Sequence, residues 1–252
     1  MSENTPITEK LDSRKISIDQ MNDYEALSSM LESHSESYMA VRGGLKNIEE
    51  AVSEVYFHLK KSDIGRLIYC GAGTSARIGV QDGAELFPTF GWPKHRVGFL
   101  IAGGKSSLFE ATEGAEDNTK NVLRGTIDRV KITKHDVLIA IAASGNTPFT
   151  CAAVKDAKKL GALTLGISNN ENGILFRYSN LKVFLDTGPE IVAGSTRLKA
   201  GTSQKICLNL ISTLLMCKMG RVKNGYMSHM VPTNQKLRLR KEIINNILKN
   251  RL

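Results

Sequence analysis

The chain has 252 residues, of which 41% are hydrophobic and 23% are charged, with a net charge of +9. This composition is typical of a globular domain, and no apolar run approaches the roughly 20 residues that a membrane helix needs. The polar stretch Met1–Lys10 lacks the apolar core of a signal peptide, so we expect a cytoplasmic protein without a membrane partner.

The cysteines and histidines predict neither disulfides nor a metal site. The cysteines have no paired spacing and lie in apolar surroundings, which predicts reduced, buried thiols. The five histidines are scattered along the chain, so no metal ligand set is expected. The cysteines are Cys70, Cys151, Cys207 and Cys217.

The positive charge is concentrated near the C-terminus. Residues 218–252 hold nine Lys or Arg against Glu242 alone, a net +8 out of the chain's +9. Such a run fits a solvated helix face, a nucleic-acid site or a field that attracts an anionic substrate. Because Tyr226 is its one aromatic residue and no nucleic-acid motif is recognisable, a nucleic-acid partner is not expected.

In chain order, residues 1–20 show no clear period and predict an extended or loosely ordered arm. Apolar residues then recur at intervals of three and four over residues 18–61, which predicts two helices, with Gly43 and Gly44 interrupting the second. Five short apolar runs follow and predict buried strands. They are Arg66–Cys70, Arg96–Ala102, Asp136–Ala143, Ala162–Ile167 and Leu181–Asp186.

Helices are expected between and after these strands. One runs from about Thr74 into the region Leu86–Gly91, where Pro88 and Pro93 are expected to end it. One covers about 106–122, and one covers 148–160. A long apolar helix follows Ser195, its expected N-cap, and reaches about Met219.

Strands that alternate with helices predict an α/β fold, a three-layer α/β/α sandwich around a mainly parallel five-stranded sheet. Residues 1–61 would form an N-terminal arm with helices, 62–220 the ligand-binding domain and 221–252 a basic, partly helical tail.

Two loops have a composition suited to an anion. Leu67–Ser75 combines a strand, a glycine-rich turn and a helix start, and Val137–Ala143 leads into the similar Ser144–Thr147. Each loop offers hydroxyl groups and backbone N–H groups at a helix start. Either loop alone could be a simple N-cap. Both together, at the carboxyl ends of two strands, predict a pocket for a phosphorylated small molecule.

The first loop also fits a dinucleotide fingerprint. Gly71–Ala76 matches G-x-G-x-x-A, and that fingerprint expects an acidic residue near the end of the following strand. The chain has Ala102-Gly103-Gly104 there, so a phosphate monoester is favoured over NAD.

These loops resemble the phosphosugar-binding loops of sugar isomerase (SIS) domains. Further motifs resemble the N-acetylmuramic acid 6-phosphate etherase family, in order and spacing, over about residues 64–237. The most specific of them is Gly194–Lys205. The others are Glu85 with Pro88–Gly91, Ile101–Gly104, Glu113–Asp117 and Gly188–Glu190.

The resemblance implies a lyase that cleaves the D-lactyl ether of N-acetylmuramic acid 6-phosphate by elimination and hydration, without metal or organic cofactor. It places the catalytic acid/base on Glu85 and a second essential carboxylate on Glu116, with Glu113 as a competing candidate. It places substrate contacts on both loops, on the acidic segment Glu113–Asp117 and in the region around the start of the long helix. These are Gly73, Thr74, Ser75, Ser144, Gly145, Asn146, Thr147, Glu113, Ser195, Thr196 and Lys199.

The position of Glu85 bears on the assembly. An unbroken helix would carry it roughly 15 Å along the axis from Ser75, further than a hexose phosphate reaches from phosphorus to C3. Either the chain bends back before Glu85, or the carboxylate serves a neighbouring subunit. We therefore expect a homodimer with shared active sites.

The chain departs from the family pattern at several positions. Ala76 stands where the family usually has glycine, and Asn146 replaces the usual arginine of the second loop; Lys199, Lys205 or the basic tail would compensate. Family members commonly continue beyond the position of Leu252 into a small helical region.

Two other functions fit the loops. One is a phosphosugar sensor, like the related regulator of glucokinase, and the other is a phosphosugar isomerase. Retention of Glu85 and Glu116 favours the lyase over the sensor, and Gly194–Lys205 favours it over the isomerase.

Overall fold

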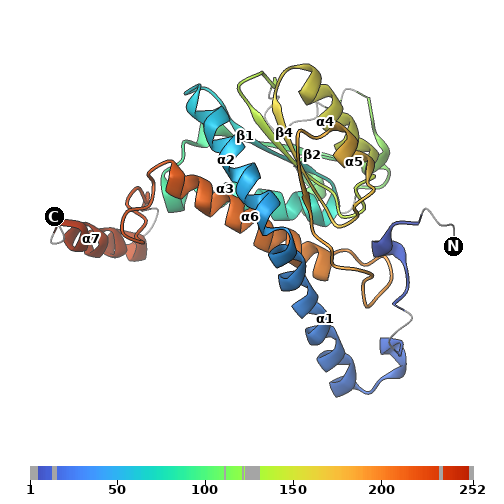
Figure 1. The fold of residues 1–252 in the computed structure, drawn as a ribbon. Helices are drawn as coiled ribbons and strands as arrows, with labels where there is room; N and C mark the ends of the chain where they lie inside the picture. Colours follow the sequence, from blue (N-terminus) through green and yellow to red (C-terminus); the bar gives the residue numbers. More distant parts are fainter. Residues whose placement is uncertain are drawn as a thin grey trace.

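The sheet of this protein has five strands, all parallel, in the order β2-β1-β3-β4-β5 (Figure 1). The computed structural model describes residues 5–12, 16–110, 112–120, 122, 131–232 and 235–249. All five expected strands are confirmed, with ends that differ by at most two residues. They are β1 Leu67–Gly71, β2 Val97–Ile101, β3 Val137–Ile141, β4 Leu163–Ser168 and β5 Leu181–Phe184.

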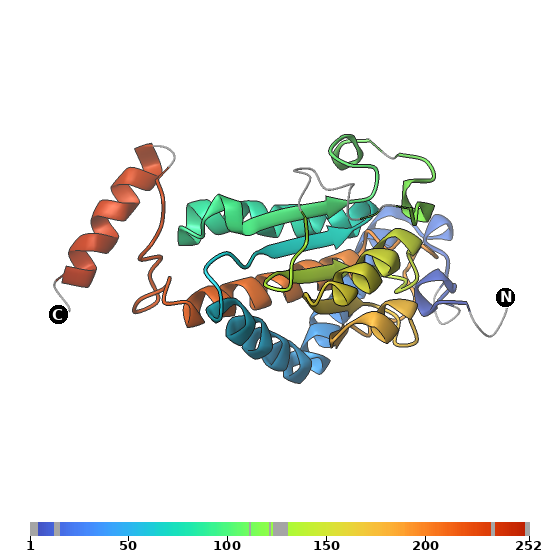
Figure 2. The same ribbon diagram turned by 90° about the horizontal axis from the view of Figure 1, so that it is seen from above.

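Helices cover both faces of this sheet, which confirms the three-layer sandwich. Because successive strand residues point to opposite faces, Leu67 and Tyr69 join one core and Ile68 and Cys70 join the other. Figures 1 and 2 show the two helical layers. One layer holds α2 (Leu45–Lys60), α3 (Gly73–Phe90) and α6 (Lys199–Lys218), and the other holds α4 (Pro148–Lys159) and α5 (Ile174–Tyr178).

The N-terminal helices divide at Gly44 rather than inside the second helix. α1 spans Asp23–Gly43, begins with a capping box between Asn22 and Glu25, and continues beyond the body of the molecule. A Cβ on Gly44 would lie 3.1 Å from the carbonyl oxygen of Phe184, so the chain passes close to β5 at this break. The fully buried side chain of Val52 on α2 shares a core with the sheet.

The helix after β1 is not ended by Pro88. α3 runs unbroken to Phe90 with Pro88 inside it, and it ends at Gly91, whose φ of 62° is left-handed. The N–H of Gly91 donates to Phe87 O (2.9 Å) and that of Trp92 to Leu86 O (3.2 Å). Pro88 lies in the last turn, so it removes one helical hydrogen bond without stopping the helix.

Two other helix predictions are wrong. The described residues of the segment 106–122 form the 3₁₀ turns Ser106–Leu108 and Ala115–Asp117 and no α-helix, and residues 111 and 121 lie outside the described ranges. Gly114 has a left-handed φ of 66° directly before the second turn, which a continuous helix does not accept. Ser195 does not cap the long helix, because α6 begins at Lys199 with Leu198 as its N-cap residue.

The N-terminal arm is docked rather than loose where it is described. Thr8 is fully buried in a 3₁₀ turn, Ile7–Glu9. The Ile7 N–H donates to Asn170 Oδ1 (2.6 Å), and Thr8 O accepts from the Gly194 N–H (3.0 Å). Residues 1–4 and 13–15 of the expected arm lie outside the described residues.

The C-terminal segment is partly helical, as expected. α7 (Gln235–Lys249) stands apart from the sheet in both ribbon views (Figures 1 and 2). Arg251 of the basic tail lies outside the described residues. Of the helices in the described ranges, none combines the length and apolar character needed to span a bilayer.

One cysteine prediction is wrong. Cys70, Cys151 and Cys207 are buried and free, as expected, but Cys217 is exposed near the end of α6.

Candidate functional site

Three loops leave the sheet side by side, at the ends of the neighbouring strands β2, β1 and β3. Gly71 at the end of β1 is in register with Ile101 of β2 on one side and Ile141 of β3 on the other. The chain crosses in opposite directions to these two neighbours, so this is the topological switch point where open α/β sheets bind ligands. Both expected phosphate loops and the acidic segment begin at this edge.

The first loop is a helix start without a side-chain cap. α3 begins at Gly73, whose φ is +52°, and no side chain of the N-cap residue Ala72 closes the first turn. The first N–H groups of a helix have no partner within it, so Gly73, Thr74 and Ser75 can donate to a phosphate oxygen.

The Ser75 hydroxyl belongs to a buried hydrogen-bond chain. It donates to Gln204 Oε1 of α6 (2.9 Å), and Gln204 Nε2 donates to Asn169 Oδ1 (2.9 Å). Asn169 Nδ2 donates in turn to Ser203 Oγ (2.9 Å). The first loop is therefore fixed to α6 and to the loop after β4.

The second loop is a tight turn with a glycine that no other residue can replace without a shift. Gly145 has a φ of +69°, and a Cβ there would lie 2.7 Å from Ser168 Oγ. Ser144 Oγ accepts from the Asn146 N–H (3.1 Å), and Thr147 is the N-cap residue of α4. Asn146 Oδ1 accepts from the Ile174 N–H (3.0 Å) at the start of α5. Asn146, which replaces the arginine usual in the family, therefore links the second loop to α5.

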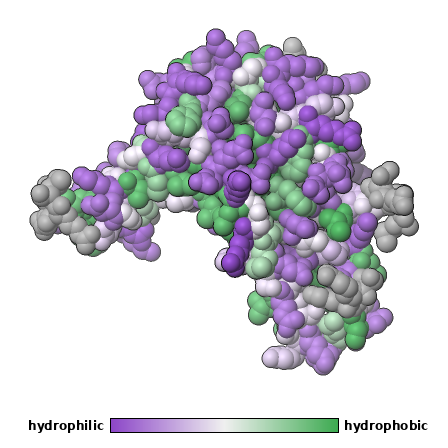
Figure 3. All heavy atoms as spheres, viewed as in Figure 1, coloured by the Kyte–Doolittle hydropathy of each residue, from purple (hydrophilic) through white to green (hydrophobic). Residues whose placement is uncertain are grey.

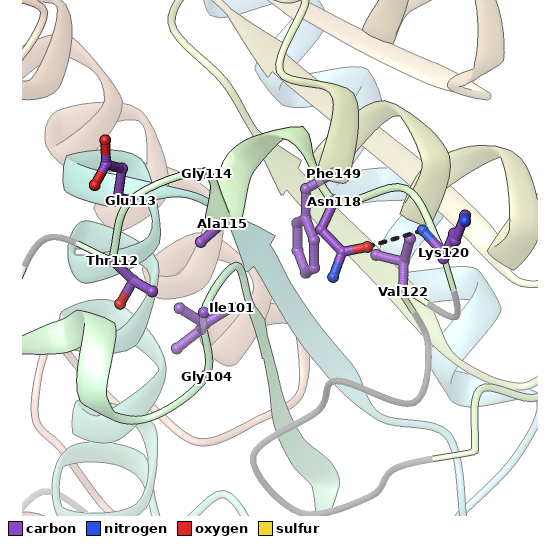
Figure 4. A pocket seen from close by; sticks show the side chains of 11 residues that line it. Ile101, Gly104, Thr112, Glu113, Gly114, Ala115, Asn118, Lys120, Val122 and Phe149 are labelled. Carbon is purple, nitrogen blue, oxygen red and sulfur yellow. Dashed lines mark hydrogen bonds between the residues drawn. The ribbon is translucent and has the colours of Figure 1, made fainter.

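The acidic segment lies next to the start of α4 across a cavity of about 520 Å³. Glu113 is exposed and lines this cavity together with Phe149, the second residue of α4. In Figure 4 the Glu113 carboxylate extends away from the Phe149 ring. Glu116 is also exposed, in the turn that follows Gly114.

The turn before α6 reaches the first loop through Gly201. Ser195 donates its N–H to Val192 O (2.9 Å), and Thr196 O accepts from the Gly201 N–H (2.9 Å). A Cβ on Gly201 would lie 3.3 Å from Thr74 Cγ2. Gly201 thus lets the start of α6 pack directly against the phosphate loop.

Within one chain, Glu85 lies away from the loops and the charge of Lys199 is already paired. Glu85 is exposed on α3, ten residues after Ser75 in an unbroken helix, which is roughly 15 Å along the axis. Lys199 is buried, and its ammonium group pairs with the carboxylate of Glu36 on α1. Within the chain, its charge is therefore matched by an acid rather than directed at a loop.

Sequence reasoning assigned no role to Gln204 or to Glu190. The carboxylate of Glu190 is buried and accepts the N–H groups of Lys199 (3.2 Å) and Ala200 (2.9 Å), so it closes the first turn of α6. Burial raises the pKa of this carboxyl, although both amides and the Lys199 charge act against the shift. Gln204 lies in the motif Gly194–Lys205 and Glu190 in the motif Gly188–Glu190. A polar side chain beside apolar positions was the sequence signal that could have indicated their structural roles.

Known proteins with related sequences match over most of the chain. Residues 47–158 match the glucokinase regulatory protein N-terminal SIS domain family, and residues 128–214 match the SIS domain family. The N-acetylmuramic acid 6-phosphate etherase of Lactococcus lactis is 42% identical over 233 residues, covering 92% of this chain and 77% of the relative. That of Geobacillus thermodenitrificans is also 42% identical over 233 residues, covering 92% and 78%.

Solved structures with low identity share the fold. A putative phosphosugar isomerase of Bacteroides fragilis superimposes with a TM-score of 0.58 at 19% identity, covering 81% of this chain and 96% of that one. The Vibrio vulnificus NanR protein complexed with ManNAc-6P gives 0.52 at 17% identity, covering 81% and 66%. These likenesses confirm the SIS-like architecture.

Proposed function

Because the chain belongs to the N-acetylmuramic acid 6-phosphate etherase family, we propose that it cleaves the D-lactyl ether of N-acetylmuramic acid 6-phosphate. The products are N-acetylglucosamine 6-phosphate and D-lactate, an amino-sugar step in cell-wall recycling. The observation that carries the proposal is the switch point itself. At that point the two phosphate loops and the acidic segment follow neighbouring strands, and the middle one of these strands, β1, is in register with both β2 and β3.

The reaction explains why this edge needs carboxylates as well as phosphate donors. In the open-chain sugar, the C1 aldehyde acidifies the C2–H bond, and a carboxylate base takes that proton. The C3–O bond then breaks, a C2=C3 double bond forms, and the departing lactate oxygen receives a proton. Water adds across the double bond, with its hydroxyl on C3 and its hydrogen on C2. We assign these proton transfers to Glu85 and Glu116.

The phosphate anchors the substrate during both steps. Backbone N–H groups at the starts of α3 and α4, with the hydroxyls of Thr74, Ser144 and Thr147, supply the donors. The second loop carries Asn146 instead of the usual arginine, so it has no cationic side chain at that position. The positive ends of the α3 and α4 helix dipoles supply positive charge for the phosphate there.

The proposal includes a homodimer in which Glu85 serves the partner's pocket. The unbroken course of α3 supports this, because the chain does not bend back before Glu85. A second support is α1, which continues beyond the body and leaves an apolar stripe exposed: Tyr24 (81%), Leu27 (63%) and Leu31 (75%). Figure 3 shows apolar residues at the surface of this projecting part. A cytoplasmic location also belongs to the proposal, supported by the free thiols of the described cysteines.

The test is release of D-lactate from N-acetylmuramic acid 6-phosphate by the purified chain. We expect Glu85→Gln and Glu116→Gln each to lower kcat by about 10²–10⁴-fold, the usual loss when a positioned acid or base is removed. Glu110→Gln is the matched control, since Glu110 is an exposed acid of the same region and should leave the rate unchanged. Lactate release that survives Glu85→Gln would remove the assignment of Glu85 while keeping the reaction.

A phosphosugar sensor is the second candidate function. The match of residues 47–158 to the glucokinase regulatory protein N-terminal SIS domain favours it. Tight binding of N-acetylmuramic acid 6-phosphate without lactate release would select the sensor, whereas conversion of an aldose phosphate to a ketose phosphate would select an isomerase.

A further inference from the structure

The cavity between the acidic segment and the start of α4 has an apolar wall that phosphate binding does not explain. Its volume of about 520 Å³ is in the range of small-molecule sites. Its wall includes Ile101 at the end of β2, Val122 and Phe149, each no more than 5% exposed, and the half-buried Ala115. A hexose phosphate offers mostly hydroxyl groups, so an apolar wall of this kind predicts a substituent with a hydrocarbon part.

One amide stands among these apolar groups. In Figure 4 the Asn118 side chain and the Phe149 ring lie on one side of the cavity, with Ala115 and Ile101 on the other. Asn118 Oδ1 accepts from the Lys120 N–H (3.0 Å), which fixes the orientation of the amide. Its Nδ2 group therefore remains as a donor at the apolar wall.

We propose that this cavity binds the 2-acetamido group of the phosphosugar. The acetyl methyl would pack against Phe149 and Ala115, and the acetyl carbonyl would accept a hydrogen bond from Asn118 Nδ2. An acetamido group has this pairing of one methyl with one carbonyl acceptor, whereas the hydroxyl of an unsubstituted sugar would leave the wall facing water. The inference rests on the proposed function and names what selects its substrate.

The location suits the chemistry. Phe149 follows the second phosphate loop by two residues, and Ala115 lies between Glu113 and Glu116 in the acidic segment. The acetamido group is attached to C2, the carbon that loses its proton, next to C3, which loses lactate. A pocket for that group would hold C2 and C3 against the acidic segment, so Phe149, Ala115 and Asn118 are positioning residues.

Binding of two product-like sugars to the whole chain tests the inference without requiring turnover. Titration calorimetry would compare N-acetylglucosamine 6-phosphate with glucose 6-phosphate, which differ at C2. We expect the acetamido sugar to bind at least about tenfold more tightly, the discrimination that a filled apolar pocket typically gives. Ala115→Leu fills the cavity, so it should remove that preference and leave the affinity for glucose 6-phosphate unchanged. Asn118→Leu should weaken the preference.

Thr119→Leu is the matched control, because Thr119 is an exposed neighbour on the same segment that does not line the cavity. Retained binding of glucose 6-phosphate shows that each variant is folded. Equal wild-type affinities for the two sugars, or equal losses for both in Ala115→Leu, would overturn the acetamido pocket while the phosphosugar site stands. Binding of neither sugar to the wild-type chain would overturn the proposed function and this inference with it.

Discussion

Asp82 is a buried carboxylate of α3 that contacts β1 and α6. Its Oδ2 accepts from the Tyr69 hydroxyl (2.8 Å), and its Oδ1 accepts from Asn209 Nδ2 (2.8 Å) and Ser212 Oγ (2.9 Å). Burial nevertheless raises the pKa of this carboxyl above its ordinary value of 3.8, because desolvation outweighs the three donors and the Lys205 charge. The residue therefore makes stability depend on pH.

A raised pKa means that the native state binds more protons than the unfolded state above pH 3.8, so stability falls as pH rises from there through the native pKa. Asp82→Asn removes this titration. We expect urea unfolding to show a steeper loss of stability with rising pH in the wild type than in Asp82→Asn across that window. Parallel curves for wild type and Asp82→Asn would contradict the prediction.

At the scale of the helix, α6 depends on an acid from outside it. Glu190 accepts the N–H groups of the first two helix residues, Lys199 and Ala200, and so has the capping role that was expected of Ser195. Glu190→Ala leaves two buried donors without a partner, so we expect a loss of about 2–3 kcal/mol in the free energy of unfolding. Glu190→Gln, which keeps an acceptor oxygen, should lose less.

Ser195→Ala is the control for this helix, because the Ser195 side chain does not cap α6. Its free energy of unfolding should stay within about 0.5 kcal/mol of the wild type. A larger loss for Ser195→Ala than for Glu190→Ala would mean that the capping assignment is wrong.

The elements that the sequence predicted well are those with a local signal. Each strand is a short apolar run bounded by polar or glycine-rich turns, and all five were located to within two residues. The helix predicted over 106–122 is wrong because Gly114 adopts a left-handed φ, which a continuous helix does not accept. The prediction of Ser195 as the N-cap of α6 is wrong because the capping group is Glu190. This residue lies eight positions before Leu198, and only the folded loop between them brings it close to the helix.

In the candidate site, too, the features with a local sequence signal were predicted and the contacts between distant residues were not. The phosphate loops are contiguous in sequence, so composition and spacing were enough to place them at the sheet edge. The contact from Ser75 to Gln204 joins residues 129 positions apart, and the acetamido cavity combines the end of β2, the acidic segment and α4. Such contacts depend on how the layers pack, which local pattern does not encode. The ion pair of Lys199 with Glu36 was missed for the same reason.

At the scale of the whole molecule, the length of α3 supports the proposed homodimer with shared sites. Ser75 and Glu85 lie at opposite parts of one unbroken helix, while the proposed reaction needs a phosphate donor and a carboxylate on the same sugar. A partner chain would resolve this if each α3 carries its Glu85 to the other subunit's loops. Two variants, each inactive alone, can then restore one another.

Glu85→Gln keeps a normal phosphate loop, and Gly145→Val disrupts that loop while keeping Glu85, since its Cβ would collide with Ser168 Oγ. Each homodimer should be inactive. In a reassociated equal mixture, half of the dimers are mixed, and each mixed dimer has one pocket with both normal parts, so about a quarter of wild-type lactate release should return. Gln81→Glu, an exposed change one turn earlier on α3, should leave activity unchanged as a control for helix substitutions. If dimers that have verifiably exchanged subunits release no lactate, Glu85 acts within its own chain and α3 must bend during turnover.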